Sequence, residues 1–153
     1  MKTMKTLHDL KAKVVEYQRD YRAPALPLLE TSGLYDLFPD VQPHADIQVE
    51  NVWPKAWPHC TRQGIYAICD DELYLLYVGK ASMTNTIGCR LSNYFAYGEG
   101  KKCRVIHDSW SRKPRFVVTV AVPQRLSFEA PALEEFLIGE LKPPDNAMGI
   151  IRG

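Results

Sequence analysis

Apolar residues in the first part of the chain recur with the spacing of a helix. They follow one another at steps of 3, 4, 3 and 4 residues, at Leu7, Leu10, Val14, Tyr17 and Tyr21. Such a stripe, with charged residues between its members, predicts an amphipathic helix over residues 6–21 that packs on its own domain. The alternative is that the stripe docks on a second copy of the chain, which would make the protein a homodimer through its N-terminal helix.

Residues 23–58 differ in composition from the rest of the chain, because they hold six of the chain's eleven prolines. Proline removes backbone donors and blocks long helices, so short turns and extended pieces are expected here, with one helical turn over residues 33–38. Large aromatic side chains such as Trp53 and Trp57 argue against disorder. We interpret residues 1–60 as an N-terminal extension, in which an amphipathic helix is followed by a proline-rich segment that wraps around the rest.

After residue 61 the hydrophobic pattern becomes sharper. Short runs of β-branched and aromatic residues predict strands, and a period of about 3.6 residues predicts helices. The predicted strands cover residues 64–69, 73–79 and 115–122, and the predicted helices cover residues 87–96 and 131–141. The first two strands are joined by a polar turn and form a hairpin. This order indicates the α/β (α+β) class, with a small, mainly antiparallel three-stranded sheet flanked by helices.

Polar side chains stand at unusual places on these elements. Two short motifs mark the hairpin strands, Gly64-Ile65-Tyr66 and Tyr77-Val78-Gly79-Lys80. Further along the chain stand Arg90, Tyr94, Glu134 and Asn146. Arg90 and Tyr94 are four residues apart and would share one face of the predicted helix.

These motifs, in this order, resemble the GIY-YIG nuclease family. The match runs from Gly64 to Asn146 and is most similar to the nuclease domain of the excinuclease C subunit. The resemblance implies a GIY-YIG type of fold for residues 61–153. It also implies a metal-dependent endonuclease that hydrolyses phosphodiester bonds in DNA.

Phosphodiester hydrolysis requires that negative charge be neutralised and that a water be activated in line with the leaving oxygen. Glu134 would hold one divalent cation, Mg²⁺ or Mn²⁺, whose remaining ligands are water and phosphate oxygens. Arg90 would bind the phosphate with its planar donor fork. Glu135 is a rival for the metal, but the interval from Glu134 to Asn146 matches the family pattern better.

The resemblance also implies roles for the remaining residues of the set. Tyr66 is expected to be the general base, helped by Lys80, while Tyr77 and Tyr94 orient water or phosphate oxygens. Because a free phenol has a pKa near 10, the pKa of Tyr66 would have to be lowered by a neighbouring cation or by the metal. Asn146 belongs to the same catalytic set, and we expect it to tie down the C-terminal segment.

Each of these residues also has an ordinary structural interpretation. A tyrosine on a strand usually packs in the core, and a glutamate near the beginning of a helix is favoured by the helix dipole. Their occurrence together and in one order favours a nuclease site. Two other functions stay open: a catalytically weak or inactive DNA-binding or regulatory module of the same fold, and a nuclease that acts on RNA.

The net charge of +1 conceals a strongly basic stretch. Residues 80–115 hold eight basic and two acidic side chains, so this stretch carries +6. The expected nucleic-acid-binding residues are Lys101, Lys102, Arg104, Trp110, Arg112, Lys113 and Arg115. The basic residues would contact phosphates, and Trp110 would stack on a base or enter a groove. The alternative is a solvated loop whose Trp110 covers the core.

The chain has no apolar run of about 18 residues, and its basic N-terminus leads into a polar segment and not into a signal core. We therefore expect no membrane association and a cytoplasmic location. The four cysteines, at positions 60, 69, 89 and 103, form no Cys-x-x-Cys pair, so reduced thiols are expected and not a zinc site.

Overall fold

The computed structural model describes residues 3–43 and 46–147. Its helices are α1 (Leu7–Asp20), α2 (Ile87–Leu91), α3 (Glu129–Leu141) and α4 (Pro144–Ala147), with short 3-10 turns at η1 (Glu99–Lys101) and η2 (Gln124–Leu126). Its strands are β1 (Glu30–Thr31), β2 (Tyr35–Asp36), β3 (Asn51–Val52), β4 (Gly64–Cys69), β5 (Leu75–Ala81), β6 (Phe95–Tyr97), β7 (Cys103–Val105) and β8 (Phe116–Ala121). The expected mixture of helices with a mostly antiparallel sheet is confirmed.

The central sheet is larger than the three strands that the sequence predicts. The three long strands lie in the order β8, β4, β5, and β4 pairs antiparallel with both neighbours along its whole length. Three strands of two residues each, from the proline-rich segment, extend this sheet: β2 and β1 pair with β8, and β3 pairs with β2. The prediction of a three-stranded sheet is thus wrong in number, because these short strands carry no readable alternation.

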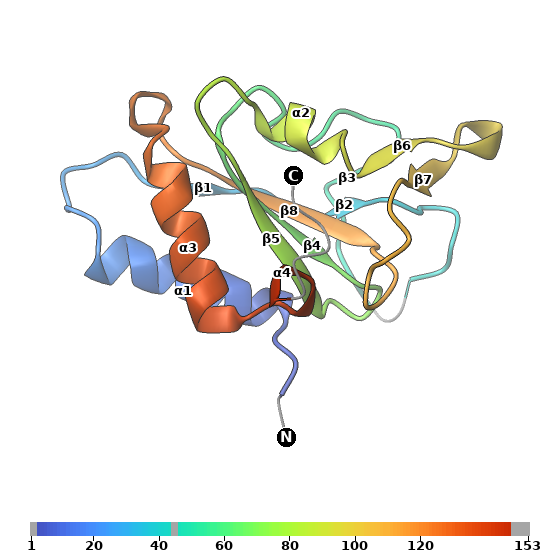
Figure 1. Cartoon of the computed structure of the whole chain (residues 1–153), viewed down its shortest axis with the longest axis horizontal. Coiled ribbons are helices and arrows are strands. Elements are labelled where there is room, and N and C mark those ends of the chain that lie inside the picture. Colours follow the sequence, from blue (N-terminus) through green and yellow to red (C-terminus); the bar gives the residue numbers. More distant parts are fainter. Residues whose placement is uncertain (1–2, 44–45, 148–153) are drawn as a thin grey trace.

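The two faces of the sheet bury different cores (Figure 1). Helices α1 and α3 lie side by side on one face and cover an aliphatic core that includes Ile65 and Ala67 of β4. The opposite face carries Tyr66 and Ile68 and is covered by α2 and by the hairpin of β6 and β7. Successive residues of a strand point to opposite faces, so β4 supplies both cores by simple alternation.

Helix α1 forms as its sequence pattern predicts. Thr6 and Asp9 make a capping box at its N-terminus, and four stripe residues are buried: Leu7, Leu10, Val14 and Tyr17. The fifth expected member, Tyr21, lies just beyond the helix and is 67% exposed. Because the stripe is covered by α3 and the sheet of the same chain, a homodimer would have to use other surfaces of the helix, and it stays a prediction.

Two local expectations are wrong. The helix expected over residues 87–96 ends at Leu91, and the chain then turns so that Phe95 begins β6. The helical turn expected over residues 33–38 is the strand β2, whose Tyr35 and Asp36 pair with β8. In both places the backbone is not helical, but apolar side chains such as Tyr35 and Phe95 are still buried in the core on the face opposite α1 and α3.

None of the described helices has the length and apolar character that crossing a membrane requires.

Candidate active site

Three tyrosine hydroxyls meet on the face of the sheet opposite α1 and α3. The Oη atoms of Tyr66 and Tyr94 lie 2.9 Å apart, and Tyr94 Oη donates to Tyr77 Oη at 3.4 Å. In the first pair either hydroxyl can be the donor. Tyr66 and Tyr94 are 0% and 1% exposed, whereas Tyr77 is 5% exposed. The three hydroxyls therefore form a connected row from the buried Tyr66 to Tyr77, the most exposed of the three.

A glycine makes room for this tyrosine cluster. Gly79 of β5 lies directly opposite Tyr66 of β4 in the ladder. A Cβ built on Gly79 would overlap the phenol ring of Tyr66 at Cζ and Oη. Gly79 of the second motif thus serves packing, because any side chain at this position would collide with the Tyr66 ring.

Tyr94 reaches the cluster from a turn and not from a helix. Its backbone N–H bonds to the carbonyl of Leu91 at 3.0 Å, and its own carbonyl accepts from Ile106 N–H at 2.8 Å. The expectation that Arg90 and Tyr94 share a helix face is wrong, since α2 ends at Leu91. The same two side chains are nevertheless brought together, because the turn after α2 directs the ring back over the sheet.

Arg90 lies next to the tyrosine cluster. Burial acts to lower the pKa of Arg90, and the three tyrosines nevertheless raise it above its ordinary value. Its Nε is buried and has no hydrogen-bond partner. A permanently charged guanidinium with an unused buried donor is suited to an anionic ligand.

Glu134 of α3 is coupled electrostatically to Arg90 and to Lys80. Burial raises the pKa of its carboxyl group, and the positive charges of Lys80 and Arg90 act to lower it. These couplings link the glutamate to both cations, although Lys80 is on β5 and Arg90 on α2. Because β5 is the last strand of the sheet, side chains from both faces can meet around it. Its neighbour Glu135 is exposed, which favours Glu134 as the residue of the site.

The pKa of Tyr66 differs from the expectation. Burial raises the pKa of Tyr66 to about 12, and the hydrogen bond with Tyr94 and the charge of Arg90 lower it by less. The expected downward shift is therefore not found, and Lys80 is not among the groups that act on this phenol. At neutral pH Tyr66 keeps its proton and acts as a hydrogen-bond donor.

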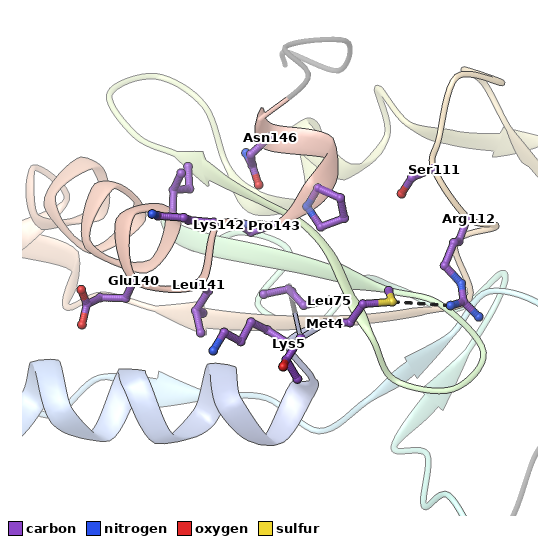
Figure 2. A pocket seen from close by; sticks show the side chains of 13 residues that line it. Met4, Lys5, Leu75, Ser111, Arg112, Glu140, Leu141, Lys142, Pro143 and Asn146 are labelled. Carbon is purple, nitrogen blue, oxygen red and sulfur yellow. Dashed lines mark hydrogen bonds between the residues drawn. The ribbon is translucent and has the colours of Figure 1, made fainter. Parts of the chain in front are cut away.

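Asn146 anchors the C-terminal segment to β5. Its side-chain amide accepts from the backbone N–H of Val78 at 2.8 Å and donates to the carbonyl of Val78 at 2.9 Å. The neighbouring Asp145 is buried and accepts from the backbone and hydroxyl of Ser111, both at 3.0 Å. Asn146 and Ser111 both line a groove of about 780 Å³ beside α4 (Figure 2), and none of the three tyrosines is in its described lining. The expected tying role of Asn146 is thus observed.

Trp110 covers the tyrosine cluster. Its ring centroid lies 6.0 Å from that of Tyr77 and 6.1 Å from that of Tyr94, and its Nε1 is buried without a hydrogen-bond partner. Of the two interpretations of this residue, covering the core describes the observed position. The contact between Asp145 and Ser111 holds the adjacent backbone in place, and this pairing across 34 residues gives no signal in the sequence.

The predicted phosphate contact of Arg115 requires correction. Arg115 is 5% exposed and makes two hydrogen bonds to the Asp36 carboxylate, at 2.8 Å and 3.0 Å, with a third to the carbonyl of Val41. Arg112 is partly engaged as well, because it pairs with Asp70 at 2.7 Å and with Glu72 at 3.1 Å. These guanidinium groups hold the protein together.

The other predicted basic residues remain available on the surface. Lys101, Lys102 and Arg104 are exposed, and they lie on the hairpin of β6 and β7 and not on the loop that was expected. Lys113 is also exposed, with its ammonium group 4.2 Å from the ring centroid of Phe38. Phosphate binding by these four side chains stays a prediction.

The described residues contain no group of three or more His, Cys, Asp or Glu side chains that could enclose a metal ion. Glu134 is instead a single, half-buried carboxylate beside two cations. That donor set fits Mg²⁺, which keeps several waters and uses one or two carboxylates together with substrate phosphates. It does not fit a closed zinc site.

Comparison of the chain with protein-family models, with curated proteins and with solved structures gives no match.

Proposed function

We propose that the protein is an endonuclease that hydrolyses phosphodiester bonds in DNA with one divalent cation, Mg²⁺ or Mn²⁺. The observation that carries this proposal is the cluster of three hydrogen-bonded tyrosine hydroxyls beside Arg90, whose charge, like that of Lys80, acts on the half-buried carboxylate of Glu134. The motif resemblance to GIY-YIG nucleases supports the same function from the sequence.

The positive groups suit the charge of the reaction. A phosphodiester is already anionic, and the transition state adds negative charge on the phosphate oxygens and on the leaving oxygen. Arg90 would bind these oxygens with the N–H donors of its guanidinium group. Lys80, near the end of β5, supplies a second positive charge that acts on Glu134.

The metal would be held by Glu134. When bound, the cation would polarise the phosphate and stabilise the leaving oxygen. The carboxylate itself is held in place by its position on α3 and by the two neighbouring cations, which favour its ionised form against the effect of burial.

The tyrosines receive different roles from those expected. Tyr66 is fully buried and protonated, so we assign it as a donor that fixes the hydroxyl of Tyr94. The Tyr94 hydroxyl is also hydrogen-bonded to Tyr77, which at 5% is the most exposed residue of the three. Of the three phenols, Tyr77 has the most solvent exposure, so we assign it to orient the attacking water.

A second candidate is a binding or regulatory module of the same fold without turnover. Trp110 favours this candidate, because its ring lies over Tyr77 and Tyr94. In the nuclease proposal the indole has to move or to share the site with the substrate. An action on RNA uses the same groups and is separated from DNA cleavage only by the substrate offered.

Incubation with nucleic acids tests these candidates directly. Supercoiled, linear, branched and single-stranded DNA, and a single-stranded RNA, are incubated with Mg²⁺, with Mn²⁺ or with EDTA. We expect metal-dependent cleavage by the wild type, a loss of about a thousandfold in Glu134→Gln, and no loss in the matched control Glu135→Gln. Binding without cleavage in any metal supports the regulatory module, and cleavage that survives in Glu134→Gln rules out the proposed mechanism.

A further inference from the structure

An aromatic side chain stands exposed at the end of the hairpin arm, by which we mean residues 95–105. Tyr97 is 61% exposed and contacts Trp53 edge to face, with ring centroids 5.1 Å apart. Figure 1 shows that β6 and β7 project from the body of the sheet on the side of α2. An edge-to-face contact covers only part of a ring, so Tyr97 presents aromatic surface to solvent.

This exposed ring is held rigidly relative to the tyrosine cluster. The indole N–H of Trp53 donates to the carbonyl of Lys101 at 3.0 Å, which ties the proline-rich segment to the tip of the arm. A continuous row of aromatic contacts then leads inward, with centroid separations of 5.7 Å, 5.9 Å and 6.1 Å, through Trp53, Trp57, Phe95 and Tyr94. A ligand on Tyr97 would therefore lie at a fixed position with respect to Tyr94 and its hydroxyl partners.

The charge around Tyr97 suits a polyanion. Lys101, Lys102 and Arg104 are all exposed on the arm, and the arm's one acidic residue is Glu99. Lys102 approaches Asp40 at 3.8 Å, but both side chains are more than 70% exposed, so solvent weakens this pair. The arm thus combines an exposed aromatic ring with a surplus of positive charge, as single-strand-binding surfaces do.

We infer that Tyr97, supported by Trp53, is a stacking surface for an unpaired base. The lysines beside it would contact the phosphates of the same strand. The inference rests on the proposed nuclease function and specifies its substrate as a strand with an unpaired segment next to the scissile bond. Base faces inside a duplex are occupied by their neighbours, so an intact duplex could use the lysines but not the ring.

Affinity measurements on two variants test the stacking contact. Both are built in the Glu134→Gln background and measured in EDTA, so that the oligonucleotide stays intact. We expect Tyr97→Leu to lose about tenfold in affinity for single-stranded and branched DNA and little for blunt duplex, because base stacking contributes strongly per base. Tyr97→Phe keeps the ring and is expected to bind as Tyr97 does. The ring is exposed, so melting temperatures of both variants should match that of their parent.

Photo-crosslinking locates the contact independently. An oligonucleotide with 5-iodouracil in its unpaired segment is irradiated with the protein, and the crosslinked peptide is identified by mass spectrometry. We expect the crosslink at Tyr97 or Trp53. A crosslink confined to other residues, or an equal loss of duplex and single-strand binding in Tyr97→Leu, overturns the inference. So does binding of polyglutamate with the same dependence on Tyr97, since the arm would then recognise an acidic protein.

The outcomes separate the inference from the function on which it rests. If the wild type cleaves DNA in a Glu134-dependent manner but Tyr97→Leu binds every substrate normally, the nuclease stands and the stacking surface is refuted. If single-strand binding depends on Tyr97 but no metal supports cleavage, the stacking surface stands and the nuclease is refuted.

Discussion

The two faces of the central sheet differ in whether their buried polar groups have hydrogen-bond partners. On the face of α1 and α3, Glu129 accepts from the guanidinium of Arg22 and from the hydroxyl of Tyr17, beside a largely apolar core. On the opposite face the polar groups are three tyrosines that share a short chain of hydrogen bonds. Beside them Arg90 Nε and Trp110 Nε1 are buried and have no partner.

On the proposed function, this difference separates a face that stabilises the fold from a face that would bind a ligand. Buried polar groups are normally satisfied, because an unmade hydrogen bond costs free energy. The α1 and α3 face obeys this rule at Glu129. The tyrosine face departs from it at Arg90 Nε and Trp110 Nε1. Such departures from the rule are typical of functional sites.

The largest effect on stability is expected from removing a hydrogen-bond partner of the buried Glu129 on the face of α1 and α3. Arg22→Met leaves the Glu129 carboxylate buried with only the Tyr17 hydroxyl, and such an unpaired charge costs about 3–5 kcal/mol of the free energy of unfolding. Urea unfolding measures this cost. Cleavage activity per folded molecule is expected to stay at the wild-type level, since neither residue lies at the tyrosine cluster.

The double variant Arg22→Met with Glu129→Gln provides the control. It removes both charges, so it should recover much of the lost stability. A drop in activity per folded molecule in either variant would show that the two faces are not separate in function.

A smaller loss of stability with a clear loss of activity is expected on the tyrosine face. In Gly79→Ala the new methyl group overlaps the ring of Tyr66, which we expect to cost about 1–3 kcal/mol of stability. Displacement of the tyrosines should lower cleavage about a hundredfold, because catalytic groups tolerate little misplacement. The matched control is Gly139→Ala on α3, where a Cβ meets nothing within 4 Å. If both variants cleave alike, Gly79 does not position the cluster.

The parts of the fold that the sequence predicted are those with a long, regular pattern. The stripe of α1, the three long strands and α3 each repeat their period often enough to be recognised. The strands β1 to β3 have two residues each, too few for any period. Spacing alone could not separate the helix expected over residues 87–96 from a short helix and a strand, since both bury Leu91 and Phe95.

The sequence indicated which residues to consider for the candidate site, but not how buried each residue is or which groups surround it. Motif order brought together the tyrosines, Arg90 and Glu134, while the pKa of Tyr66 depends on burial that no motif reports. Arg115 shows the same limit for a contact between residues that are far apart in the sequence. Its partner Asp36 is 79 residues away, so a charge that looks free in the sequence is paired in the fold.

The smallest expected effect is the loss of folding stability caused by keeping the half-buried Glu134 ionised. Burial raises the pKa of this carboxyl group in the folded protein, so folding favours its protonated form. Below the pKa of the unfolded chain both states are protonated and no penalty exists. As the pH rises through the unfolded and then the folded pKa, ionised Glu134 destabilises the folded state, and the penalty is complete above the folded pKa.

Glu134→Gln removes this penalty, because its amide does not ionise. In EDTA we expect the variant to melt above the wild type at pH 7, and the difference to shrink as the pH falls below the ordinary range of a glutamate. Mg²⁺ should act in the opposite direction, raising the melting temperature of the wild type and leaving that of Glu134→Gln unchanged, since a ligand that binds only the folded state stabilises it. The exposed Glu135→Gln carries the same change in net charge and should follow the wild type in both series. A wild type that is more stable than Glu134→Gln at pH 7 in EDTA would mean that the carboxylate has a structural partner, and Glu134 would then belong with Glu129 among the groups that hold the fold.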